Sequence, residues 1–156
     1  MMQKTLIILK PDAVQRGLVG EIVARFEKKG LKLVANKMAM LKSETLREHY
    51  GHLVDKPFFP AIESFMMSSP VVLQVWEGFK AIDTVRLMCG VTNSREAAPG
   101  TIRGDLSTSY GSNVIHASDS PEAAEQEVAR FFKADEVFDY NKIIEQYSYS
   151  DDERKK

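Results

Sequence analysis

Apolar and polar positions alternate with two different periods along this chain, and each change of period marks an expected element. Thr5–Leu9 is a continuous apolar run of strand length, and Lys10-Pro11 ends it because proline interrupts a ladder of hydrogen bonds. Apolar side chains then recur at helical intervals over Val19–Lys29, and Gly30 is suited to end that helix. The run Leu31–Leu41 is the next strand candidate, so the pattern predicts a β-α-β opening.

The rest of the chain keeps this alternation, apart from one long stretch of little periodicity at Val91–Ser112. The whole order is β-α-β-(α-α)-β-α-loop-β-α, which predicts an α/β chain of the α+β type, with a ferredoxin-like βαββαβ antiparallel sheet, added helices and a long loop. The remaining elements are helices over Ser43–Leu53 (capped by Ser43), Phe58–Met67, Ala81–Cys89 and Pro121–Lys133, and strands over Val71–Trp76 and Val114–Ala117.

Composition adds that the chain forms one domain. The chain is 44% hydrophobic, which is enough to form one core. Its 156 residues are too few for two domains of ordinary size. We expect a single domain over residues 1–149. Residues 150–156 read S-D-D-E-R-K-K, which is typical of a frayed, solvated tail.

Net charge and cysteine content limit which partners and which cellular location we expect. A formal net charge of −1 gives no bulk attraction to nucleic acid or to anionic membranes, so any phosphate must be held by a few local charges. No apolar run approaches the roughly 18 residues that span a bilayer. Cys89 is the single cysteine and no charged-then-apolar leader precedes the first strand, so we expect a cytoplasmic protein.

The most informative stretch is N-V-I-H-A-S-D-S, which runs from Asn113 to Ser120. It places His116 where a predicted strand meets a helix start, and Ser120 with Pro121 is a good cap and first-turn pair for that helix. A helix N-terminus offers unpaired N–H groups and partial positive charge, which favour a phosphate. A neutral imidazole is a competent nucleophile, so the stretch indicates phosphate chemistry at His116.

This octapeptide resembles the N-x-x-H-x-S-D-S signature of the nucleoside diphosphate kinase family at all five specified positions. The resemblance extends over nearly the whole chain, because three further blocks are similar to family blocks in the same order. They are T-L-I-I-L-K-P-D-A-V-Q-R-G-L-V-G-E-I at Thr5–Ile22, K-P-F-F at Lys56–Phe59 and P-G-T-I-R-G-D at Pro99–Asp105. The resemblance implies the same ferredoxin-like fold.

The family resemblance also implies roles for particular residues. Ser118 and Glu127 are expected to orient the His116 ring, and Glu127 lies two helical turns after Ser120, on the same face. The unperiodic stretch carries Thr92, Arg95 and Arg103, which fits a loop around an anionic ligand. By position in the family pattern, Arg86, Thr92 and Arg103 match phosphate-binding residues, Lys10 and Asn113 match contacts to the sugar hydroxyl and neighbouring oxygens, and Tyr50 matches a residue that orders the histidine's surroundings.

A base-binding site is expected at the start of the helix after Lys56. Phe58 would present an aromatic face and Ile62 an aliphatic wall, whereas Phe59 is expected in the core. Stacking on Phe58 would allow the site to accept purine and pyrimidine bases alike, because every base has a π-face. Tyr110 departs from the family pattern, in which a small aliphatic residue is common, and would add a second stacking face or narrow the site.

The resemblance implies ping-pong transfer of the γ-phosphoryl group of a nucleoside triphosphate such as ATP to a nucleoside diphosphate, through a phosphohistidine at His116. Mg²⁺ is expected to arrive with the nucleotide, because it prefers phosphate oxygens and water and no carboxylate cluster in the sequence is built to hold it. A homohexamer is expected, since the segment Y-N-K-I-I-E-Q-Y-S-Y after Phe138 can pack on a neighbouring subunit as it does in longer family members.

Two alternatives remain at this point. One is a nucleotide-binding regulatory protein of the same fold that has lost catalysis, although the chemical residues above are all present. The other treats His49 and His52 as metal ligands together with His116, because an i, i+3 spacing puts the first two on one helical face. No cysteine or pair of carboxylates near them in the sequence completes a tetrahedral set.

Overall fold

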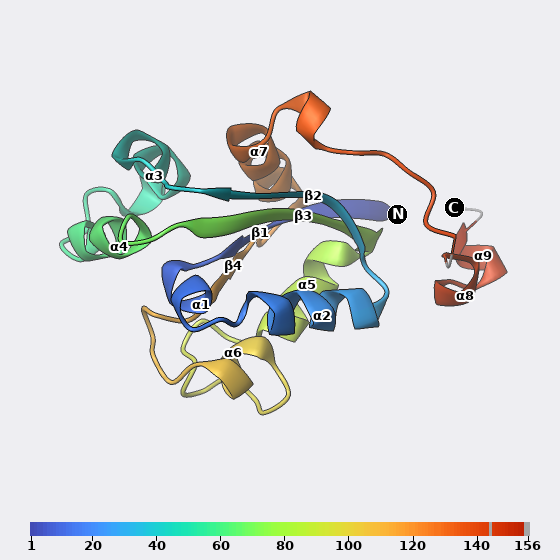
Figure 1. Ribbon diagram of the computed structural model, residues 1–156, viewed down its shortest axis with the longest axis horizontal. Helices are drawn as coiled ribbons and strands as arrows, with labels where there is room; N and C mark the ends of the chain where they lie inside the picture. Colours follow the sequence, from blue (N-terminus) through green and yellow to red (C-terminus); the bar gives the residue numbers. More distant parts are fainter. Residues whose placement is uncertain (144, 155–156) are drawn as a thin grey trace.

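A four-stranded antiparallel sheet crosses the centre of the molecule, as the computed structural model of residues 1–143 and 145–154 shows (Figure 1). Its strand order is β2-β3-β1-β4, in which β3 separates β2 from β1, and every neighbouring pair is antiparallel. This is the split βαβ arrangement of a ferredoxin-like fold, as the order of the elements in the sequence predicts. The strands are β1 (Met2–Leu9), β2 (Lys32–Ala39), β3 (Val71–Phe79) and β4 (Ile115–Ala117).

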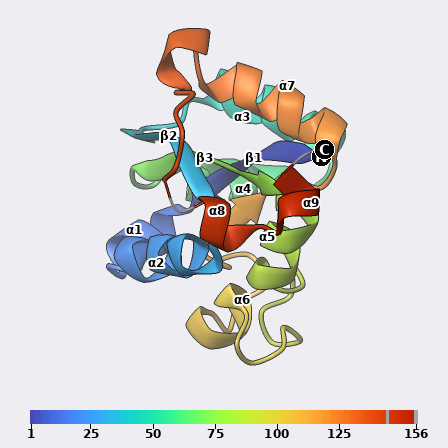
Figure 2. The same ribbon diagram turned by 90° about the vertical axis from the view of Figure 1, so that its right-hand side faces the viewer.

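Helices cover both faces of this sheet, with α3 and α7 on one side and α1, α2, α5 and α6 on the other (Figures 1 and 2). The helices are α1 (Pro11–Gln15), α2 (Val19–Lys29), α3 (Ser43–His49), α4 (Phe59–Met66), α5 (Ala81–Cys89), α6 (Ile102–Leu106), α7 (Pro121–Phe131), α8 (Glu145–Ser148) and α9 (Asp151–Arg154), with 3-10 turns at Gly51–Leu53 and Ala134–Glu136.

Two apolar clusters hold these layers together, one on each face of the sheet. Ile7 and Leu9 of β1 pack in the cluster that contains side chains of α2 and α5. Leu6 and Ile8 point to the opposite face and pack in the cluster that contains side chains of α3, α4 and α7. Because β1 is buried on both faces, its sequence is a continuous apolar run rather than an alternating one.

Several predicted boundaries are confirmed. α2 and α5 begin and end at the expected residues, and Gly30 ends α2 with a φ of 97°, a left-handed conformation that glycine adopts without steric cost. Ser120 caps α7 by accepting a hydrogen bond from the Ala123 N–H at 3.0 Å. Strong periodicity and local capping chemistry therefore predicted these helices correctly.

The prediction of one helix over Ser43–Leu53 was wrong in two ways. Ser43 is the first helical residue rather than the cap, and its hydroxyl donates to Glu63 Oε1 at 2.6 Å. The helix ends at His49, and the chain continues as a separate 3-10 turn from Gly51, a residue that disfavours helix interiors. His49 and His52 therefore do not share a face of one helix.

Further segments differ from the prediction. The helix α1 was not expected, and β3 runs to Phe79, beyond its expected end at Trp76. The stretch Val91–Ser112 contains α6, a short helix that Thr101 caps by accepting from the Gly104 N–H. The tail is helical over Asp151–Arg154 rather than frayed, because the Ser150 N–H and hydroxyl both bond to the Glu153 carboxylate. The last two residues of the predicted tail, 155 and 156, lie outside the described part of the chain.

Candidate active site

A polar cleft with a volume of about 560 Å³ opens at the end of the sheet where β1 and β4 meet α3, α5 and α7. Among the residues predicted for the site, those that line the cleft are Lys10, Tyr50, Arg86, Thr92, Arg103, Asn113, His116 and Glu127. The fold thus gathers side chains that are far apart in the sequence around His116. Ser118 lies beneath this group and is fully buried.

His116 sits on β4 directly opposite Ile8 of β1, and its side chain is 21% exposed. Its Nε2 lies 3.0 Å from Glu127 Oε1. The Ser118 hydroxyl donates to the other oxygen of that carboxylate, Oε2, at 2.6 Å and accepts from the Leu6 N–H. Ser118 therefore contacts Glu127, which in turn contacts the His116 ring.

A strained turn sets the start of β4. Val114, which was expected inside this strand, has a φ of 62°, a rare conformation for a β-branched residue. The Ile115 N–H donates to the Asn113 carbonyl across it at 2.8 Å, which is the hydrogen bond of a γ-turn. The Asp12 carboxylate accepts from the Val114 N–H at 3.0 Å and holds the turn. Such strain costs about 1–3 kcal/mol and is typical of functional sites.

Glu127 remains ionised in this setting. Burial acts to raise the pKa of its carboxyl, but the hydrogen bonds and charge of His116, with the bond from Ser118, outweigh it and lower the pKa below its usual value. A carboxylate against a ring N–H fixes the tautomer of the imidazole and favours the positive charge that develops when the other nitrogen attacks. The arrangement is that of an oriented nucleophile.

His49 packs beside His116 in the cleft, and the sequence did not indicate this contact. Its ring packs edge-on against those of His116 and Tyr50, at centroid distances of 4.6 Å in both cases. Burial, followed by the charge of His116, lowers the pKa of His49 to about 3, so this ring stays neutral. Burial, with the charge of Glu127, raises the pKa of Tyr50 to about 12 and keeps its hydroxyl protonated.

The proposed set of metal ligands is corrected by this geometry. The ligand atoms of His49, His116 and Glu127 all lie within 4.8 Å of one another, whereas His52 is not part of the group. A carboxylate does complete the set, and it comes from α7 rather than from the sequence near the histidines.

Lys10 and Asn113 form the wall of the cleft next to β1. The Lys10 ammonium donates to Asn113 Oδ1 at 2.5 Å, and the Asn113 amide donates to the Thr92 carbonyl at 2.8 Å. Burial, together with the positive charge of Arg103, lowers the pKa of Lys10 to about 8. A nearby phosphate would compensate this unfavourable burial of a cation.

The two arginines of the cleft differ in their contacts. Arg103 is only 9% exposed, and its guanidinium donates to the carbonyls of Gly90 at 2.8 Å and Ile115 at 2.7 Å. Burial acts to lower its pKa, and the charge of Arg86 adds to that effect. Arg86 is exposed, and within residues 1–143 and 145–154 no ion pair or hydrogen bond of its side chain is found. Arg86 is therefore free to meet an anion, whereas Arg103 also supports β4.

The residues predicted to bind a base lie outside the lining of the cleft. Phe58 is 52% exposed and Tyr110 is 63% exposed, so both aromatic rings are accessible to a ligand. Ile62 is half-buried and packs against the core cluster. Phe59 is 1% exposed, which confirms its expected place in the core.

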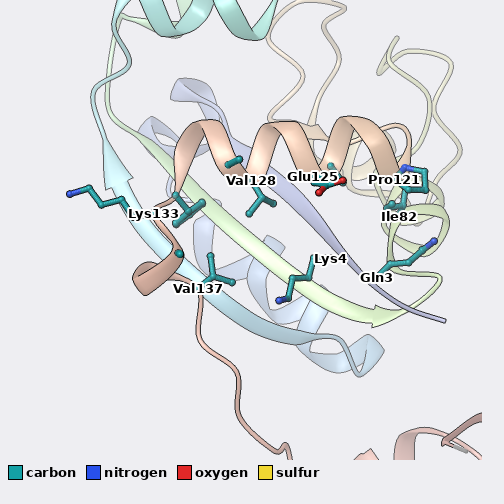
Figure 3. A pocket seen from close by; sticks show the side chains of 12 residues that line it. Gln3, Lys4, Ile82, Pro121, Glu125, Val128, Lys133 and Val137 are labelled. Carbon is teal, nitrogen blue, oxygen red and sulfur yellow. The ribbon is translucent and has the colours of Figure 1, made fainter. Parts of the chain in front are cut away.

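A second hollow, of about 580 Å³, lies on the other side of α7 (Figure 3). Val128, Phe132 and Val137 are among its lining residues, and Lys4 and Lys133 lie at its edge. Its lining is mainly apolar and contains no histidine or arginine. The histidine and the arginines predicted for the site therefore lie at the polar cleft and not at this hollow.

Sequence comparisons agree with this geometry. A family profile described as "Nucleoside diphosphate kinase" matches residues 3–137. A nucleoside diphosphate kinase of Parabacteroides distasonis is 61% identical over 139 residues, which cover 89% of this chain and 91% of that protein. Nucleoside diphosphate kinase B of Pongo abelii is 49% identical over 148 residues, which cover 95% of this chain and 97% of that protein.

Structural comparison extends the match to the whole fold. The structure of a halophilic nucleoside diphosphate kinase from Halobacterium salinarum in complex with CDP superposes with a TM-score of 0.94 at 45% identity, covering 96% of this chain and all of that one. The Aquifex aeolicus nucleoside diphosphate kinase gives a TM-score of 0.85 at 42% identity, covering 88% of this chain and all of that one.

Proposed function

The chain belongs to the nucleoside diphosphate kinase family, a family of phosphotransferases, and we propose that the polar cleft around His116 is where it transfers the phosphoryl group. The observation that carries this proposal is the bond between His116 Nε2 and Glu127 Oε1 at 3.0 Å. With Nε2 engaged, the lone pair available for attack is that of Nδ1. The nucleophile is therefore fixed in orientation before a nucleotide binds.

The reaction consists of two transfers through one histidine. His116 Nδ1 attacks the γ-phosphorus of a nucleoside triphosphate, the bond from phosphorus to the β,γ-bridging oxygen breaks, and the nucleoside diphosphate leaves with that oxygen. Nε2 keeps its proton and donates a hydrogen bond to the Glu127 carboxylate, which stabilises the ring charge in the transition state. A second diphosphate then attacks the phosphorus through a terminal oxygen, and the nitrogen–phosphorus bond returns its electron pair to Nδ1.

Charge around the transferred group comes from three cations. Phosphoryl transfer requires positioning and stabilisation of the equatorial oxygens more than covalent chemistry from the protein. Arg86, which is exposed, has the freedom to follow a phosphate, whereas Lys10 and Arg103 are held by their neighbours. The Thr92 hydroxyl adds an uncharged donor at the rim. We assign Arg86, Thr92 and Arg103 to the phosphate chain, and Lys10 and Asn113 to the sugar hydroxyl and the neighbouring oxygens.

A base-binding role for Phe58, Ile62 and Tyr110 completes the site. The exposed rings of Phe58 and Tyr110 lie outside the polar lining, which fits a base that extends away from the phosphates. The Halobacterium salinarum relative was solved with CDP, which supports binding of a nucleoside diphosphate here. Replacement of Phe58 by alanine should raise KM for purine and pyrimidine nucleotides alike. A loss confined to one base would contradict the stacking role.

Mg²⁺ is assigned to the nucleotide rather than to the protein. The three-residue group at His49, His116 and Glu127 offers two nitrogens and one carboxylate, whereas Mg²⁺ prefers six oxygens. The phosphate oxygens themselves supply that preferred chemistry, and the ion neutralises their charge when it is bound. Chelation by excess EDTA should stop transfer without unfolding the protein, which circular dichroism would check.

The assembly and location complete the proposal: a single catalytic domain over residues 1–149 that forms a cytoplasmic homohexamer without nucleic-acid partners. The side chains of Phe138, Ile143 and Tyr147 are between 63% and 86% exposed, which supports burial against a neighbouring subunit. No helix among the described residues is long and apolar enough to cross a membrane. Light scattering should give a mass of six 17.6 kDa chains, and a tetramer would contradict the hexamer.

Steady-state kinetics tests the proposed site. ATP is varied at several fixed concentrations of dCDP with wild type, Glu127→Gln and Glu125→Gln, the last a matched control on the outer side of α7. Wild type and the control should give the parallel double-reciprocal lines of a ping-pong reaction. The Glu127 variant should lose kcat with little change in KM. Equal loss in both variants would show that the cleft is wrongly assigned.

A further inference from the structure

We propose that His49, His116 and Glu127 form a site for a divalent transition-metal ion of the zinc type, and that an ion bound there inhibits the enzyme. This role is separate from the Mg²⁺ that accompanies a nucleotide. The site does not depend on the proposed transfer reaction, because the ion would bind the protein without any nucleotide.

The distances between the ligand atoms suit such an ion. His116 Nε2 is 3.0 Å from Glu127 Oε1, and His49 Nδ1 is 3.8 Å from the same oxygen. Zinc in a tetrahedral site holds nitrogen and oxygen ligands at about 2.0–2.1 Å, which places neighbouring ligand atoms about 3.4 Å apart. An ion would fit these two separations after shifts of a few tenths of an ångström. The two imidazole nitrogens, which lie within 4.8 Å of each other, would approach by rotation of the His49 ring.

His49 provides a second and independent observation. Its side chain is 1% exposed, and its Nε2 is buried without a hydrogen-bond partner among the described residues. A buried, unsatisfied polar atom calls for an explanation, and phosphoryl transfer through His116 does not supply one. A metal bond through Nδ1, the nitrogen that faces Glu127, would anchor this ring, and Nε2 would then carry the proton of the neutral imidazole.

The charges around the ligand set are mixed, because Lys10, Arg86 and Arg103 line the same cleft. Glu127 brings one negative charge to the ligand set. Arg130 brings a positive charge close to the ligand set, because its Nη1 lies 3.5 Å from His49 Nδ1. The same guanidinium is 2.9 Å from the exposed carboxylate of Glu48, so it can remain paired there when an ion displaces it from His49. Asp119, which also lines the cleft and is exposed, adds negative charge at the entrance.

The ligand chemistry selects the class of ion. Two imidazoles and one carboxylate with a fourth position open to the cleft form the ligand set of many zinc sites. Imidazole also suits Cu²⁺, Ni²⁺ and Co²⁺, whereas Mg²⁺ and Ca²⁺ require more oxygen ligands. The Mg²⁺ ion of a magnesium–nucleotide complex would therefore not compete with zinc for these ligands.

Inhibition follows from the tautomer of His116. A neutral imidazole that binds a metal through Nε2 carries its remaining proton on Nδ1. The ion thus replaces the proton between Nε2 and Glu127, and Nδ1 becomes an N–H without the lone pair that attacks phosphorus. Glu127, occupied by the ion, can no longer stabilise the ring charge. Removal of the ion restores both groups, so the inhibition is reversible.

Zinc binding to the full-length, nucleotide-free protein tests the site. Zn²⁺ is titrated in competition with a chromophoric chelator for wild type, His49→Gln and His52→Gln, the last a matched histidine outside the group. We expect one ion per chain in wild type and in the His52 variant, and at least a tenfold weaker affinity in the His49 variant. Unchanged affinity in the His49 variant, or equal weakening in both, would overturn the proposal.

Two readouts keep the test decisive if the His49 variant folds poorly. X-ray absorption of the zinc-loaded wild type should show two imidazoles and a carboxylate, and a shell without imidazole would overturn the site. Formation of the phosphoenzyme at buffered free zinc should fall as the site fills and return after chelation. If zinc binds with this shell and the phosphoenzyme still forms at the full rate, the inhibitory role is wrong.

Discussion

Glu127 is the residue that connects the structure around His116 to its chemistry. One carboxylate oxygen faces the imidazole and the other accepts from Ser118, so both are fixed. The signature around His116 identified the nucleophile from the sequence, and helical spacing placed Glu127 on the correct face. No sequence signal indicated that Ser118 acts through Glu127, or that His49 joins the cluster, because these contacts depend on how distant segments pack.

At the residue scale, Arg86 and Arg103 should respond differently to replacement by alanine. Both changes should lower kcat/KM by at least about tenfold, since each removes a cation from the phosphate region. Only Arg103→Ala should also lower the free energy of unfolding, by about 1–3 kcal/mol, because the carbonyls of Gly90 and Ile115 lose their donors. Thermal unfolding beside kinetics would check this, and equal losses of stability would contradict it.

A pH dependence follows from Lys10. Its pKa is lowered to about 8, first by burial and then by Arg103, so the free enzyme carries this charge at pH 7 and loses it as the pH rises through 8. We expect kcat/KM to fall on the alkaline side with an apparent pKa near 8, because this parameter reports the free enzyme. In Lys10→Arg the charge persists and the fall should disappear. An unchanged alkaline limb in that variant would assign it to another group.

At the scale of elements, regular periodicity predicted the helices reliably. Errors arose in segments that are too short for a period or that are shaped by contacts with distant residues. α2 and α5 were predicted to the residue, because an amphipathic pattern and a terminal glycine agree there. α6 was missed because five residues are too few for periodicity to show. The turn at Val114 was missed because β-branched residues favour strands, and the contacts of Asp12 and Lys10 with this residue come from a segment far away in the sequence.

The cap of α7 gives an element-scale prediction. Ser120→Ala removes the acceptor for the Ala123 N–H and should lower the free energy of unfolding by about 1 kcal/mol, which is about 2–4 °C in Tm for a chain of this size. Ser43→Ala is the comparison variant, because Ser43 caps no helix but its hydroxyl donates to Glu63 Oε1 at 2.6 Å. It should lower the free energy of unfolding by about 0.5–1.5 kcal/mol through loss of that bond. An unchanged Tm in Ser120→Ala would contradict the cap of α7.

Close packing of α6 gives a second prediction at this scale. A methyl group at Gly104 would overlap the Ala98 carbonyl oxygen, so Gly104→Ala should destabilise the fold by about 1–3 kcal/mol and shift the neighbouring Arg103. At Gly20 in α2 the same methyl group meets nothing within 4 Å, and alanine there should stabilise by about 0.4–1 kcal/mol. Denaturant unfolding of both variants would check the opposite signs, and a neutral Gly104→Ala would contradict the packing described.

At the scale of the whole molecule, the antiparallel sheet brings distant sequence blocks to one end. The order of elements predicted the ferredoxin-like topology, since two split βαβ units leave few arrangements for the strands. The cleft was less predictable. Its lining joins residues from β1 to α7, and its electrostatics depend on burial, which lowers the pKa values of both Lys10 and His49. The fold could be predicted from patterns and most residues of the cleft from the family resemblance, but their contacts and pKa shifts required the packed structure.

In the proposed reaction, His116 carries the phosphoryl group between nucleotides. We would test this first by the intact mass of the purified protein mixed with magnesium-ATP, beside His116→Ala and followed by a chase with GDP or dCDP. Wild type alone should gain one acid-labile phosphoryl group and lose it on the chase. If wild type still binds nucleotide but gains no phosphoryl group, the cleft is a regulatory binding site and not the centre of the reaction.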